Sequence, residues 1–84
     1  MIPYSRQSIS KEDIETVVKV LKSDFLTQGK EVPAFEGSVC EYTGSKFAIA
    51  VNSATSGLHI ACLALGLGNG DTLWTSPITF VASA

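Results

Sequence analysis

Four hydrophobic residues near the start of the chain recur at positions i, i+3, i+4 and i+7: Ile14, Val17, Val18 and Leu21. Ser10 stands just before this run, and Asp13 follows it three residues later, a pairing that resembles the capping box of a helix N-terminus. The pattern therefore predicts an amphipathic helix over residues 11–23.

A second helix is predicted between Pro33 and Gly44. Proline is favoured in the first turn of a helix, and glycine is favoured just after its end. Three hydrophobic residues between them keep helical spacing: Phe35, Val39 and Tyr42. Residues 24–31, which join the two helices, are polar, contain a glycine and show no period, so we expect a loop there.

The hydrophobic pattern changes after residue 46 to short apolar runs. Residues 47–51 form such a run, with two β-branched members, and are typical of a buried strand. A helix is expected to begin at Thr55 or Ser56 and to close at Gly66, and residues 72–75 are expected to form a second strand. This order predicts a βαβ unit with a right-handed crossover, and hence an α/β fold.

Charge is distributed unevenly along the 84 residues. Of the 14 charged residues, 13 lie between Arg6 and Lys46, and only Asp71 follows. A small independent domain needs charge over its whole surface, whereas a neutral second half is typical of an interior that other elements cover. Because the length is about half that of a usual domain, we expect the sequence to be an incomplete part of one domain.

The composition argues against several functional classes. A net charge of −2 with a pI of about 5.1 gives no basic surface for nucleic acid or for an anionic membrane. The uncharged stretch 47–69 has a polar middle, which disfavours a membrane span, and no secretory signal is visible, so the cytoplasm is the expected compartment. Cys40 and Cys62 match no metal motif and are expected to be buried free thiols.

The junction Asn52-Ser-Ala-Thr-Ser-Gly57, between the first predicted strand and its helix, is the first candidate site. Small residues allow a ligand to approach the backbone, and the free N–H groups of a helix start attract an anion. Ser53, Thr55 and Ser56 also offer hydroxyl donors. Two interpretations stay open: a phosphate site, or a hydroxyl that simply caps the helix.

The second candidate is the segment from Thr75 to Phe80, which follows the second predicted strand. Parallel strands bring their carboxyl ends to one edge of a sheet, so this segment is expected near Thr55. The ring of Phe80 is then either a stacking surface beside the bound anion or part of the core. Trp74 is expected in the core, and His59 is expected to be a packed, hydrogen-bonded imidazole.

Five ordered motifs resemble the DegT-type nucleotide-sugar aminotransferases over essentially the whole chain: Leu26-Thr-Gln-Gly, Pro33-x-Phe-Glu, Val51-Asn-Ser-Ala-Thr-Ser-Gly-Leu-His, Gly68-x-Gly-Asp and Thr75-Ser-Pro-x-Thr-Phe-Val-Ala-Ser-Ala. The resemblance implies the N-terminal part of a fold-type I transferase that depends on pyridoxal phosphate. It assigns residues 1–46 to N-terminal helices with a substrate-side loop, and 47–84 to the start of the cofactor-binding α/β domain. It also implies a homodimer whose active site lies at the subunit boundary.

The resemblance also implies site residues. The cofactor phosphate is expected at Ala54, Thr55 and Ser56, and Phe80 is expected to stack on the pyridine ring. The segment Thr27, Gln28, Gly29 and Lys30 is similar to the loop that borders the sugar nucleotide, with Lys30 as a contact to the diphosphate. No metal site is implied.

The implied reaction moves an amino group, with glutamate as the expected donor, to C4 of a UDP-4-keto-6-deoxy-N-acetyl-hexosamine. The lysine that holds the cofactor in this family lies downstream of Ala84, so these 84 residues are expected to be inactive alone and to contain no catalytic residue. Two alternatives remain: an aminotransferase for another nucleoside-diphosphate keto sugar, and a catalytically inactive relative with a regulatory role.

Overall fold

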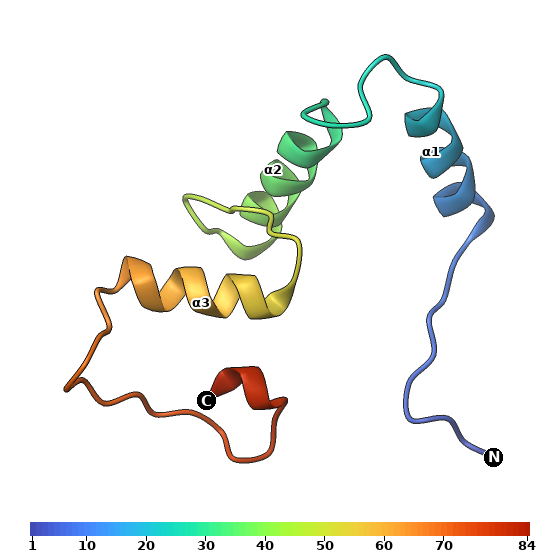
Figure 1. Ribbon diagram of the computed structural model, residues 1–84. Helices are drawn as coiled ribbons and strands as arrows, with labels where there is room; N and C mark the ends of the chain where they lie inside the picture. The colour runs from blue at the N-terminus through green and yellow to red at the C-terminus, as the bar shows by residue number, and fades with distance from the viewer. The chain divides into compact units, whose positions relative to one another are not determined.

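The computed structural model describes residues 1–84, which form three α-helices and one short 3₁₀ helix (Figure 1). The α-helices are α1 (Lys11–Leu21), α2 (Glu31–Thr43) and α3 (Ala54–Ala64), and the 3₁₀ helix is η1 (Val81–Ser83). The chain divides into two compact units, Met1–Ala48 and Ile49–Ala84, and each is described by itself. None of the helices is long and apolar enough to cross a lipid bilayer.

Helix α1 begins with the predicted capping box. The Ser10 backbone N–H donates to Asp13 Oδ2 at 2.8 Å, and the Asp13 N–H donates to Ser10 Oγ at 3.1 Å. These two bonds satisfy backbone donors that a helix start leaves unpaired. The helix ends at Leu21, two residues earlier than predicted, and the Ser23 hydroxyl donates to the Val20 carbonyl at 2.6 Å beyond that end.

The capping box lowers the pKa of Asp13, chiefly through the hydrogen bond from the Ser10 backbone and secondly through the Ser10 side chain. A lowered folded-state pKa means that the carboxylate stabilises the helix start above its unfolded pKa, and that this contribution is lost as pH falls through the folded pKa. We expect Ser10→Ala to raise the Asp13 pKa toward its ordinary value. Carboxyl ¹³C NMR titration measures this shift. The control is Ser8→Ala, which alters no bond of the capping box, and in this variant the Asp13 pKa should match that of the wild type.

Helix α2 begins at Glu31, so Pro33 lies within its first turn, where a missing N–H costs no helical hydrogen bond. Its end agrees with the prediction. Gly44 has a left-handed φ of 72° and its N–H donates to the Cys40 carbonyl at 2.9 Å. Only glycine adopts this conformation without a steric penalty, which explains why the helix stops there.

Helix α3 also ends on a glycine, through a Schellman motif. Gly66 has a φ of 72°, and its N–H donates to the Leu63 carbonyl at 3.0 Å. The next N–H, of Leu67, donates to the Cys62 carbonyl at 3.0 Å. Gly66 thus stands one residue beyond the cap, Leu65, rather than at the cap itself. The start, at Ala54, is one or two residues earlier than the predicted Thr55 or Ser56.

The predicted βαβ unit is not observed, because the chain contains no β-strand. Residues 47–51 and 72–75, the two predicted strands, carry no regular secondary structure on either side of α3. A strand exists only when its backbone groups pair in a ladder with a neighbouring strand. These two segments do not pair, so their apolar pattern alone does not make them strands.

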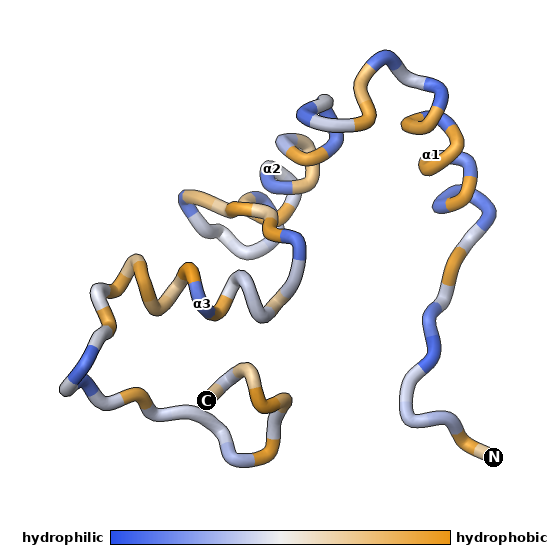
Figure 2. The backbone as a smooth tube through the Cα atoms, in the orientation of Figure 1, coloured by the Kyte–Doolittle hydropathy of each residue, from blue (hydrophilic) through white to orange (hydrophobic).

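No side chain in the chain is buried. Hydrophobic and hydrophilic residues alternate along α1 in Figure 2, as its sequence period predicts, yet its hydrophobic residues remain largely exposed. Trp74, expected in the core, is 93% exposed. Cys40 and Cys62 are free thiols, as expected, but each is half-buried rather than buried. The helices are therefore set by local hydrogen bonds and caps rather than by a shared core.

Candidate functional site

The N-terminus of α3 is built on Ser53, which caps the helix. Ser53 has extended dihedral angles (φ −157°, ψ 157°), and its Oγ accepts a hydrogen bond from the Ser56 N–H at 3.2 Å. This is the usual geometry of a serine N-cap. The capping interpretation of this junction is therefore correct for Ser53, and the question becomes which donors remain for an anion.

A chain of side-chain hydrogen bonds runs across the same junction. The Ser53 hydroxyl donates to Ser56 Oγ at 3.0 Å, and the Ser56 hydroxyl donates to Asn52 Oδ1 at 2.8 Å. Each hydroxyl has one hydrogen to donate, so both serines have already used theirs. The Ser56 N–H is used as well, by the cap. Ser56 thus stabilises the shape of the turn in this structure.

Three donors in the first turn of α3 remain unpaired: the backbone N–H groups of Ala54 and Thr55 and the Thr55 hydroxyl. The first turn of α3 contains no acidic residue, whereas those of α1 and α2 contain carboxylates. The helix macrodipole places a partial positive charge at the same end. A phosphate group suits this turn, because the turn has unpaired donors, carries a partial positive charge and contains no carboxylate.

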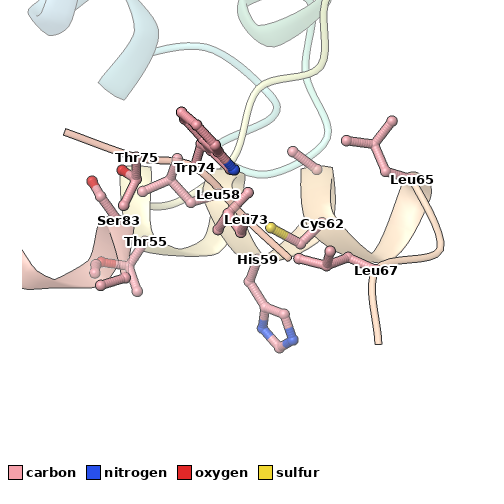
Figure 3. A pocket seen from close by; sticks show the side chains of 13 residues that line it. Thr55, Leu58, His59, Cys62, Leu65, Leu67, Leu73, Trp74, Thr75 and Ser83 are labelled. Carbon is pink, nitrogen blue, oxygen red and sulfur yellow. The ribbon is translucent and has the colours of Figure 1, made fainter. Parts of the chain in front are cut away.

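Thr55 also lines a cavity of about 600 Å³ in the second unit. The cavity lies among α3, the segment that follows it, and η1, and Figure 3 shows its lining side chains. Most of the lining is apolar: Leu58, Ala61, Cys62, Leu65, Leu67, Leu73, Trp74, Ala82 and Ala84. The polar members are Thr55, His59, Thr75 and Ser83. An apolar wall with a few polar groups is usual for small-molecule sites.

Three of the four predicted cofactor residues, Ala54, Ser56 and Phe80, do not line this cavity. Ala54 and Ser56 flank Thr55 in the first turn of α3. Phe80 is the N-cap of η1, with extended dihedral angles, and its side chain is 74% exposed. A ring this exposed has space on its faces, and its stacking role stays a prediction.

The predicted substrate loop belongs to the first unit and shapes a smaller cavity of about 240 Å³. Gly29 and Lys30 line this cavity, together with Asp24 and Glu31 among others, whereas Thr27 and Gln28 do not. Gln28 has a left-handed φ of 54°, and a Cβ on Gly29 would lie 3.1 Å from the Phe25 carbonyl oxygen. The loop is thus tightly turned at Gln28 and closely packed at Gly29.

Sequence reasoning missed two features of this region. It named Asn52 only as part of a polar junction and did not identify it as the acceptor for Ser56. Asn52 precedes the N-cap Ser53 and so lies outside the helix, and no helical spacing rule signals this bond. It also gave no role to Ser83, whose place on the cavity depends on how η1 folds back against α3.

Comparisons with known proteins agree on one family. Residues 7–84 match the model of the DegT/DnrJ/EryC1/StrS aminotransferase family. Two curated relatives, from Campylobacter jejuni serotypes O:2 and O:23/36, are each 50% identical over all 84 residues, and both are named UDP-4-amino-4,6-dideoxy-N-acetyl-beta-L-altrosamine transaminase. The chain spans about 22% of the length of each relative. No solved structure is significantly similar to it.

Proposed function

Because the chain belongs to the DegT/DnrJ/EryC1/StrS aminotransferase family, we propose that it contributes the cofactor-phosphate end of the active site in a pyridoxal-phosphate-dependent aminotransferase. The observation that carries the proposal is the first turn of α3, where the Ala54 and Thr55 N–H groups and the Thr55 hydroxyl are unpaired and which contains no acidic residue. These residues fit the phosphate of the cofactor, which is a dianion at neutral pH.

Pyridoxal phosphate, when bound, supplies the electron sink that allows an amino group to pass between an amino acid and a keto sugar. The residues of this chain hold and orient it. Thr55 donates its hydroxyl hydrogen to a phosphate oxygen, while Ala54 and Thr55 donate their N–H groups. Ser53, Ser56 and Asn52 keep the turn in the shape that directs those donors outward. Phe80 covers one face of the pyridine ring.

The substrate we propose is a UDP-4-keto-6-deoxy-N-acetyl-hexosamine, with glutamate as the amino donor. Its support is the name shared by the two Campylobacter jejuni relatives, both transaminases of a UDP-linked amino sugar. The segment from Thr27 to Lys30 borders the sugar nucleotide in this proposal. Lys30 supplies the cation that would attract the diphosphate, although the carboxylates of Asp24 and Glu31 line the same cavity.

We further propose that the whole enzyme is a homodimer with the active site at the subunit boundary. The second unit has a single charged residue, Asp71, and no buried side chain. The rest of the whole enzyme and a second subunit can both cover these apolar groups, and interfaces of permanent dimers are large and apolar.

The reaction itself tests the proposal. The full-length enzyme, supplied with pyridoxal phosphate, glutamate and a UDP-4-keto-6-deoxy-N-acetyl-hexosamine, should form 2-oxoglutarate and the 4-amino sugar nucleotide in equal amounts. Chromatography of the sugar nucleotide and an enzymatic assay for 2-oxoglutarate measure both products. A mixture without the keto sugar is the control. Product with a 3-keto sugar alone would reassign the substrate, and no product with any keto sugar would contradict an aminotransferase role.

A further inference from the structure

Two hydroxyl groups outside the first turn of α3 line the same cavity as Thr55. One belongs to Thr75, in the segment between α3 and η1, and the other to Ser83, in η1 itself. In Figure 3, the side chains of Thr55, Thr75 and Ser83 lie toward one end of the cavity, and those of Leu65 and Leu67 toward the other. The three hydroxyl-bearing side chains thus lie toward the end of the cavity where α3 begins.

These hydroxyls retain hydrogen-bonding capacity. Thr75 makes no side-chain hydrogen bond, and the only partner of Ser83 Oγ is Thr79 Oγ1 at 3.4 Å, which is long for two hydroxyls. The neighbouring serine behaves differently, because Ser76 Oγ accepts the Ile78 N–H at 3.3 Å and so shapes the turn. Thr75 and Ser83 are therefore available to a ligand in the cavity.

No lysine, arginine or carboxylate lines this cavity. The polar side chains that line it are three hydroxyls and the His59 imidazole, and hydroxyl groups suit an anion because they rotate to meet an oxygen acceptor. Building on the proposed function, we infer that Thr75 and Ser83 donate hydrogen bonds to the cofactor phosphate held at α3. With Thr55 they form a cluster of three hydroxyls drawn from three separate parts of the second unit.

Cofactor titration of the full-length apoenzyme tests this inference, with pyridoxal phosphate and with pyridoxal, which lacks the phosphate. We expect Thr75→Val and Ser83→Ala each to raise the dissociation constant for pyridoxal phosphate roughly 10- to 150-fold, as expected for a lost hydrogen bond to a charged group. The dissociation constant for pyridoxal should not change. Thr72→Val is the matched control, because Thr72 is exposed and does not line the cavity.

Variants that keep the hydroxyl, Thr75→Ser and Ser83→Thr, should retain the wild-type affinity for pyridoxal phosphate even if the valine and alanine variants fold poorly. Two results would overturn the inference and leave the proposed function standing. In the first, the Thr75 and Ser83 variants lose equal affinity for pyridoxal phosphate and for pyridoxal. In the second, these variants bind pyridoxal phosphate as the wild type does, while Thr55→Val binds it more weakly. A wild-type apoenzyme that binds no pyridoxal phosphate would overturn both.

Discussion

Thr55→Val in the full-length enzyme is expected to raise the dissociation constant for pyridoxal phosphate roughly 10- to 150-fold. Valine keeps the shape of threonine but removes the one hydroxyl in the first turn of α3 that has no protein partner. A hydrogen bond to a charged group contributes about 1.5 to 3 kcal/mol, which corresponds to that change in affinity. Titration of the apoenzyme, followed by cofactor absorbance, measures it.

Ser56→Ala is the matched comparison, because Ser56 lies beside Thr55 but donates its hydroxyl hydrogen to Asn52. We expect this variant to lower the melting temperature more than it lowers cofactor affinity. The opposite pattern, with affinity lost at Ser56 and unchanged at Thr55, would mean that the hydrogen-bond chain rearranges when the cofactor binds. If neither variant alters affinity, no side chain of the first turn of α3 holds the phosphate.

The isolated 84-residue chain is expected to lose all cooperative folding and all specific cofactor attachment. No side chain is buried, and helices of 11 to 13 residues are marginal in water without packing. Thermal unfolding followed by far-UV circular dichroism should therefore show a gradual slope. Trp74, which is 93% exposed, should give little near-UV signal.

Cofactor attachment provides an independent measurement on the same isolated chain. We expect none of its five lysines to be the one that holds the cofactor, so borohydride reduction in the presence of pyridoxal phosphate should label them weakly and without preference. Peptide mass spectrometry locates the label, and the full-length enzyme treated identically is the control. A cooperative melt, or stoichiometric labelling of one lysine, would contradict the expectation.

The Ser10 cap of α1 and the Gly44 cap of α2 were the most predictable features of this molecule, because they depend on neighbouring residues. The Ser10 and Asp13 capping box forms as predicted, and Gly44 ends α2 in the left-handed conformation that glycine tolerates best. Each feature involves bonds that span three or four residues. A sequence therefore contains all the information that such a feature needs.

The predicted strands fail for the converse reason. Residues 47–51 have the apolar, β-branched composition of a buried strand, but a ladder requires a partner that the composition does not specify. In the candidate site, too, local features could be predicted and long-range ones could not. The cap at Ser53 was an open alternative from sequence alone, whereas the place of Ser83 on a cavity with Thr55 depends on residues nearly thirty positions apart.

The hydrogen-bond chain at the start of α3 also fixes which way the Asn52 amide faces. Its oxygen accepts from Ser56, so its NH₂ group is the part of the amide that is left to donate. Aspartate has nearly the same shape and would accept the same bond. It would also place a negative charge at the end of the helix where we expect a phosphate, and the two anions would repel each other. Asparagine keeps the acceptor and avoids that charge. Asn52→Asp would therefore preserve the shape of the side chain but add a negative charge beside the expected phosphate.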